Sequence, residues 1–241
     1  MRIGTWNVEY AAGLEKNAQR RAILVQQACD VWVLTETHDE LELTATHTAV
    51  HSMQRPTGRL GGRWASIWTS YRVLQRIEVV DPRRTVAALV EAPSGLLIIY
   101  GTVMPWASDR GDAGPGTPVR NWSELHRVVV QQGEEWATLR RRYPKTNLCV
   151  VGDLNMNLGG QHYYGTAQSR RLLREAMAQC GLFCATQTER LPIGALAHPP
   201  IDHVLLPVAW EPRVQVVAAW EGKSGLAPRL SDHSGLVVAV G

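Results

Sequence analysis

Nine short runs of β-branched and other apolar residues recur along this 241-residue chain, each five to eight residues long. Runs of this length and composition, separated by turn-forming residues, predict β-strands rather than helices. The predicted strands cover residues 2–8, 31–36, 64–69, 85–90, 96–103, 148–152, 202–206, 214–220 and 236–240. So many strands have to be buried in one or more sheets, and this requirement limits the fold more than any other feature.

Three longer segments repeat their apolar residues every three or four positions, which is the spacing of one helix face. They cover residues 14–29, 122–139 and 172–180, and Gly181 ends the third. Helical and strand segments alternate over residues 2–36 and again over residues 122–180. Further strands lie between these two parts of the chain and after the second. This order predicts an α/β (α+β) protein in which helices cover sheets in layers.

The composition fits a folded protein with a sizeable core. Hydrophobic residues make up 45% of the chain and charged residues 20%, and the formal net charge is +3, so a disordered chain is excluded. The slight basic excess permits a polyanionic substrate. The four cysteines lie far apart in apolar contexts, without the spacing of a disulfide framework or a zinc site, so we expect buried thiols at Cys29, Cys149, Cys180 and Cys184.

Met1 leads directly into the first predicted strand, and no apolar run approaches the roughly 20 residues of a membrane-spanning helix. We therefore expect a cytoplasmic protein without a membrane partner.

The most Gly/Pro-rich stretch, residues 108–118, has three interpretations: an interdomain linker, a long functional loop, or an ordinary surface loop. Candidate site residues lie on both sides of it, which argues against the linker. We therefore expect a single domain over residues 1–241, acting as a monomer.

The strongest local motif is VVGDLN at residues 150–155, an apolar strand that ends in a glycine and two polar residues. Alternate residues of an extended chain point the same way, roughly 7 Å apart, so Asp153 and Asn155 can reach one ligand together. Taken alone, the motif would also fit an ordinary turn after a strand.

Two further motifs pair an acid with a histidine. Asp232 and His233 precede the last predicted strand and offer an oxygen ligand beside a group that titrates near neutral pH. Asp202 opens a buried strand, where a carboxylate needs a partner such as an imidazole. Its neighbour His203 is expected to point to the opposite face. Each pair alone would fit a solvated or capped turn.

Polar residues also end the first two predicted strands, in TWNVE with Asn7 and in LTET with Glu36. The ends of neighbouring strands meet at one edge of a sheet, where α/β proteins build their sites. Glu9 shares the face of Asn7, and it either supports a metal site there or is a solvated strand end.

The ordered motifs TWNVE, LTET, VGDLNMN, IDHVLL and LSDHSGLVV resemble the endonuclease/exonuclease/phosphatase superfamily. The resemblance extends from Trp6 to Val238 in the family's order. It implies a four-layer αββα sandwich, with two packed, mainly antiparallel β-sheets flanked by helices and the site at one edge of the sheets.

The resemblance also implies roles and a cofactor. Metal-site residues are Asn7, Glu36 and Asp232; the catalytic residues are Asp153 on the attacking water, Asn155 on the phosphate, and His233 oriented by Asp202. The cofactor is Mg²⁺ or Mn²⁺, which favours oxygen ligands. Many members carry a tyrosine or histidine near the position of Val103, where this chain has none. Thr102 or a residue of the loop from Trp106 to Pro118 is the candidate substitute, and Trp106 could stack on a base or a hydrophobic substrate group.

The leading hypothesis is a divalent-metal-dependent phosphodiesterase, a nuclease that cleaves nucleic acid by in-line attack of water. One alternative is a phosphatase or lipid-headgroup phosphodiesterase of the same fold. The other, from a different class, is an inactive member that acts as a binding module. The retained set of acids, amides and histidine argues against that last alternative, because a pure binding module has no need to place acids around a phosphate.

Overall fold

In the computed structural model, which describes residues 1–55, 59–114, 116–223 and 228–241, the strands form two six-stranded sheets. Sheet A is ordered β11-β12-β1-β2-β4-β3 and comprises β1 (Arg2–Asn7), β2 (Val31–His38), β3 (Thr48–His51), β4 (Gly62–Thr69), β11 (Val214–Trp220) and β12 (Gly235–Val240). Sheet B is ordered β5-β6-β7-β8-β10-β9 and comprises β5 (Arg72–Ile77), β6 (Thr85–Ala92), β7 (Gly95–Val103), β8 (Asn147–Asp153), β9 (Leu182–Cys184) and β10 (Asp202–Pro207).

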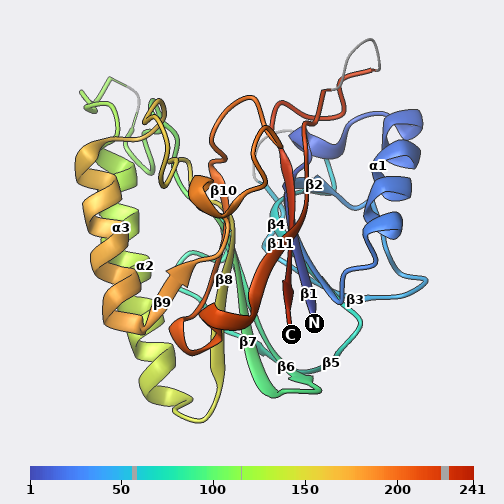
Figure 1. Ribbon diagram of the computed structural model, residues 1–241. Coiled ribbons are helices and arrows are strands. Elements are labelled where there is room, and N and C mark those ends of the chain that lie inside the picture. The colour runs from blue at the N-terminus through green and yellow to red at the C-terminus, as the bar shows by residue number, and fades with distance from the viewer. Residues whose placement is uncertain (56–58, 115, 224–227) are drawn as a thin grey trace.

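The two sheets lie face to face between helices, which gives the predicted four layers (Figure 1). Helix α1 (Leu14–Gln27) covers the outer face of sheet A, while α2 (Ser123–Arg142) and α3 (Ala167–Cys180) cover sheet B. Short 3₁₀ turns are η1 (Glu9–Ala11), η2 (Thr188–Arg190) and η3 (Val208–Arg213). Strand pairs are antiparallel except β1–β2 and β7–β8, which are parallel. The predicted fold is therefore confirmed.

The central strands are apolar throughout because both of their faces are buried. In β2, Val31 and Val33 pack between the two sheets, while Trp32 and Leu34 pack under α1. In β8, Val151 faces the space between the sheets and its neighbour Val150 faces α2 and α3. Strands of this kind read as continuous apolar runs in the sequence.

The predicted strands all occur, but three observed strands, β3, β5 and β9, were missed. All three lie at sheet edges. Most residues of β5 are exposed, and β9 has only three residues. An edge strand pairs on one side only, and these three are short or polar, so their sequences carry little strand signal.

The helices differ from prediction only at their ends. Trp122 was placed inside the second helix, but it precedes α2 in a left-handed conformation, with φ of 69°. Helix α3 begins five residues earlier than predicted because Thr166 and Ser169 form a capping box at its start.

The four cysteines are buried and free, as predicted. Among the helices in the described part of the chain, none is long and apolar enough to cross a membrane.

Candidate active site

The ends of several strands meet at one end of the sandwich, and both sheets contribute. Asn7 ends β1 and Asp153 ends β8, while Asp202 opens β10 and lies opposite Asp153 in the antiparallel ladder. The Asn7 side chain connects the sheets, since its Nδ2 donates to Asp153 Oδ2 at 3.1 Å and to Glu36 Oε1 at 3.2 Å. Residues far apart in the chain are thereby brought into contact.

The backbone at the site adopts conformations that most residues avoid. Glu36 has φ of 46° and Asn155 has φ of 50°. In the β2–β4 ladder Thr35 pairs with Ala65 and Thr37 with Arg63, so Glu36 is left out of the ladder between them. Such conformations cost on the order of 1–3 kcal/mol each and occur mostly where function requires them.

Gly152 is required by the approach of two strands immediately before Asp153. Its φ is 139°, and a Cβ added there would lie 2.1 Å from the Thr102 carbonyl oxygen. Only glycine fits this position. The glycine before Asp153 in the VVGDLN motif is therefore required by the close pairing of β7 with β8.

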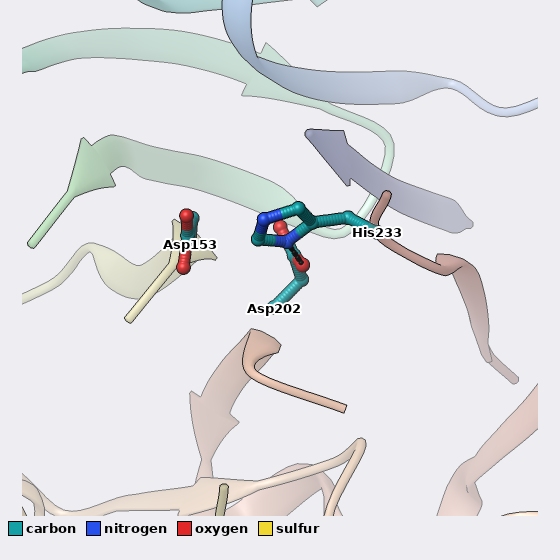
Figure 2. Close-up of side chains that lie close together, drawn as sticks. All are labelled: Asp153, Asp202 and His233. Carbon is teal, nitrogen blue, oxygen red and sulfur yellow. Dashed lines mark hydrogen bonds and ion pairs between the residues drawn. The ribbon is translucent and has the colours of Figure 1, made fainter. Parts of the chain in front are cut away.

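His233 is oriented by a buried carboxylate. Its Nδ1 lies 2.6 Å from Asp202 Oδ2, and Figure 2 shows the ring extending toward Asp153 and Asp202. The Asp202 contact occupies Nδ1 and leaves Nε2 to face a substrate. Ser231 fixes the turn that carries His233, because its hydroxyl donates to the Asn7 carbonyl at 2.5 Å and accepts from the His233 amide at 3.0 Å.

Asp153 is fully buried, and its two oxygens accept different bonds. Oδ1 accepts from the Asn155 amide at 2.9 Å, and Oδ2 accepts from Asn7. Burial, and after it the neighbouring Asp202 carboxylate, raises the pKa of Asp153 to about 7. A base with a pKa near the working pH accepts a proton most effectively.

Opposing effects act on the pKa of His233. Burial lowers it, but the charges of Asp202 and Asp153 and the hydrogen bond to Asp202 outweigh burial and raise the pKa to about 10. The ring is therefore an imidazolium at neutral pH and carries a proton that it can donate.

The raised pKa of His233 predicts how stability depends on pH in the metal-free protein. The pKa rises from 6.5 to about 10 on folding, so the stabilisation is complete below pH 6.5 and is lost as the pH rises toward 10. We expect the melting temperature of the wild type in EDTA, measured by scanning calorimetry, to fall between pH 7 and 10 relative to His233→Gln. Asp153 acts in the same direction but between about pH 4 and 7, outside this window. Parallel curves for the two proteins would contradict a charged Asp202–His233 pair.

The surplus of negative charge at the site fits a divalent cation. Glu36, Asp153 and Asp202 offer three carboxylates against one imidazolium, which leaves two negative charges when all are ionised. Carboxylate oxygens of Asp153 and Asp202 lie within 4.8 Å of each other, and Asp202 Oδ1 is buried without a hydrogen-bond partner. Mg²⁺ and Mn²⁺ prefer such oxygen donors.

The site brings together most of the predicted residues, but their roles stay predictions. Asn7, Glu36, Asp153, Asp202 and His233 surround one point, and Asn155 adjoins it. Asn155 Nδ2 donates to the Met104 carbonyl at 2.7 Å. Asn7 presents its amide nitrogen to the carboxylates, because its oxygen accepts from the Glu9 amide at 3.0 Å. Asn7 thus orients Glu36 and Asp153 in this structure.

Two predicted residues lie on the outer side of the site. The side chain of Asp232 is 52% exposed and pairs with Arg229 at 3.7 Å. Arg229 also forms an ion pair with Glu9. Glu9 and Asp232 are therefore linked through one arginine at the surface instead of joining the buried carboxylates.

Thr102 and Trp106 lie outside the group for different reasons. The Thr102 hydroxyl is buried under α2, where it accepts from Gln132 Nε2 at 2.9 Å. The prediction that Thr102 replaces the missing tyrosine or histidine is wrong, because its side chain faces away from the site. Trp106 is half-buried and contacts Trp64.

Sequence reasoning missed two tyrosines beside the site. The Asn157 Oδ1 accepts from the amides of Tyr163 and Tyr164 at 3.2 Å each and folds their loop back. Burial, followed by the Asp202 charge for Tyr163 and the Asp153 charge for Tyr164, raises the pKa of each hydroxyl. The recurrence of asparagine at 155 and 157 was the only signal for this loop.

The acids, amides and imidazolium at one end of a two-sheet sandwich suit the hydrolysis of phosphoric esters. A buried base near pKa 7 can take a proton from water, and an imidazolium faces the same space.

Comparison with known proteins places the chain in a family. A profile of the Endonuclease/Exonuclease/phosphatase family matches residues 4–233, and the chain belongs to this family. A search of curated proteins gave no match.

Solved structures share the fold at low sequence identity. One is the 3'-5' exonuclease NExo from Neisseria meningitidis, with a TM-score of 0.67, 16% identity and coverage of 100% of this chain and 99% of that one. An AP endonuclease from Archaeoglobus fulgidus has a TM-score of 0.66, 15% identity and coverage of 100% and 99%. A point variant of NExo from Neisseria, described as a 3' phosphatase bound to a product DNA hairpin, has a TM-score of 0.68, 16% identity and coverage of 100% and 99%.

Proposed function

We propose that this chain is a Mg²⁺- or Mn²⁺-dependent phosphodiesterase that hydrolyses nucleic acid. The observation that carries the proposal is the position of Asp153, which contacts Asn7 and lies next to the Asp202–His233 pair. This arrangement places a base and a proton donor around one space at the junction of the two sheets.

The residues divide the reaction between them. Asp153 takes a proton from water as the water oxygen bonds to phosphorus in line with the departing oxygen. The P–O bond to the leaving group then breaks, and that oxygen takes a proton from His233. Asp202 holds the imidazolium in place, and the strained backbone at Asn155 positions its amide beside Asp153.

Glu36 would hold the cation, with Asn7 fixing its carboxylate and also that of Asp153, which is left to act as the base. When bound, the cation supplies positive charge that offsets the charge developing on the phosphate oxygens.

A phosphomonoesterase is the second candidate. It is favoured because NExo is described both as a 3'-5' exonuclease and as a 3' phosphatase, names that correspond to a phosphodiester and a phosphomonoester substrate on one fold. The same residues could act on a terminal phosphate without any change in the roles given above.

A substrate panel tests the proposal. Purified protein is incubated with Mg²⁺, Mn²⁺ or EDTA and offered bis(p-nitrophenyl) phosphate, p-nitrophenyl phosphate, and single-stranded, duplex, abasic and 3'-phosphorylated DNA, with RNA and inositol phosphates in parallel. We expect metal-dependent cleavage of the diester and of a nucleic acid. Release of phosphate from monoesters alone would select the phosphatase. Folded protein that binds metal but hydrolyses none of these would contradict both.

A further inference from the structure

Arginine side chains and aromatic rings alternate in a stack beside the candidate active site. The Arg55 guanidinium carbon lies 4.4 Å from the ring centroid of Tyr10 and 3.9 Å from that of Trp64. The rings of Trp64 and Trp106 lie 5.8 Å apart with planes tilted by 36°, and Arg84 lies 5.6 Å and 5.5 Å from them. We call these five residues the arginine–tryptophan ladder.

The ladder begins at the active site. Tyr10 follows Glu9, whose amide donates to Asn7 Oδ1 at 3.0 Å, so this end of the ladder adjoins a residue of the site. At the other end, Trp106 follows Met104 by two residues, and the Met104 carbonyl accepts a bond from Asn155. The ladder therefore adjoins the site on two sides, through η1 and through the segment that follows β7.

The ladder also borders an open cavity of about 650 Å³, within the range of small-molecule sites. Trp64, Trp106 and Arg84 form part of its lining, with the first turns of α2. The arginines of this cavity are neutralised by neighbouring acids, in the pairs Arg83–Asp112 at 3.6 Å, Arg84–Asp109 at 2.5 Å and Arg127–Glu124 at 2.6 Å. The cavity thus offers aromatic surface rather than net positive charge.

Arg55 differs from these arginines. Within the described part of the chain it forms no ion pair with an acid, and its Nε is buried without a hydrogen-bond partner. It is a cation held between two aromatic rings close to the acids of the site, which suits a contact with a ligand phosphate.

We propose that the ladder and its cavity bind an unpaired nucleobase of the substrate strand, next to the phosphodiester held at Asp153, while Arg55 contacts the adjoining phosphate. The inference rests on the proposed function and specifies its substrate as a strand with unpaired bases. Aromatic faces stack on any base, whereas a paired base in a duplex cannot turn out of its helix without losing its own stacking.

Binding of labelled strands to the full chain in EDTA tests this proposal without turnover. Fluorescence anisotropy compares fluorescein-labelled dT12, a 12-unit tetrahydrofuran abasic strand of equal charge, and a duplex. We expect the wild type to bind dT12 about 5- to 150-fold more tightly than the abasic strand, the effect expected for stacking of one base. Trp106→Ala should remove this preference, and Trp106→Phe should keep most of it.

Arg55→Met should weaken binding of dT12 and the abasic strand equally. It should also reduce the salt dependence of the binding constant by the amount expected for the loss of about one phosphate contact. The matched control is Arg142→Met, because Arg142 also lies over an aromatic ring, 5.4 Å from that of Tyr143 at the end of α2. This control should leave both affinities unchanged.

Equal affinity of the wild type for dT12 and the abasic strand would overturn the ladder proposal, as would an unchanged preference in Trp106→Ala or no binding of either strand. Hydrolysis of bis(p-nitrophenyl) phosphate in Mn²⁺ reports on the active site alone. A base preference that depends on Trp106, together with no hydrolysis in any metal, would instead contradict the proposed function.

Discussion

Asp153→Asn is expected to lower kcat for phosphodiester hydrolysis by about a thousandfold or more, with much smaller changes in KM. The substitution keeps the size of the side chain but removes the base that accepts the proton of the attacking water, and general acid–base catalysis and charge stabilisation each contribute about 10²-fold or more. Steady-state kinetics with bis(p-nitrophenyl) phosphate in Mn²⁺ measures the loss.

The same variant separates catalysis from folding. The burial of a charged Asp153 is unfavourable, which is why its pKa is raised. The pH dependence of the melting temperature in EDTA between about pH 4 and 7 should therefore be flatter in Asp153→Asn than in the wild type. Glu175→Gln, which alters an exposed carboxylate on α3, serves as the control and should match the wild type in rate and stability. Activity within tenfold of wild type in Asp153→Asn would rule out its role as the base.

Asp202→Asn is expected to lower kcat by about a hundred- to ten-thousandfold and to change the shape of the pH–rate profile. Asp202 is the strongest influence that raises the pKa of His233 against the effect of burial, so its neutralisation lowers that pKa. The alkaline limb of the profile, where the imidazolium loses its proton, should move to lower pH. Initial rates from pH 5 to 10.5 in a constant-ionic-strength buffer measure both effects.

A double mutant shows whether Asp202 acts through His233. Residues that work as one unit give losses that do not add. His233→Ala combined with Asp202→Asn should therefore be no slower than His233→Ala alone by more than a few-fold. Losses that multiply would mean that Asp202 has a separate effect, and an alkaline limb unmoved in Asp202→Asn would contradict the pairing at Nδ1.

The central strands could be predicted from the sequence because burial on both faces leaves a long apolar run. Val31 to Leu34 in β2 illustrates this, with alternate residues in different cores. The edge strand β5 could not, because it is mostly exposed and its stability depends on pairing with β6, a neighbour that local sequence does not reveal.

The site residues on strands could be predicted because the ends of neighbouring strands meet at one edge of a sheet. Asn7, Asp153 and Asp202 end or open buried strands, so the pairing of those strands determines where their side chains lie. Alternation along β7 would also have excluded Thr102, because it shares the face of Tyr100, which packs against α2. That argument requires knowing which face of β7 looks toward the helices.

Residues in turns were harder to place. Asp232 and His233 are adjacent, and only the histidine enters the site. Ser231 determines which of the two side chains points into the site, because its hydrogen bond to the Asn7 carbonyl sets the direction of the turn. The ladder likewise joins η1, β4 and three loops, and no local pattern relates Arg55 to Trp64 and Trp106.

The most direct test of the central claim is the rate of bis(p-nitrophenyl) phosphate hydrolysis as Mn²⁺ is added to metal-free wild type and to Asp153→Asn. We predict no turnover in EDTA, a saturable rise with Mn²⁺ in the wild type, and at most about a thousandth of that rate in the variant. Full activity in EDTA, or an equal rise in Asp153→Asn, would show that hydrolysis does not depend on these carboxylates and would contradict the account.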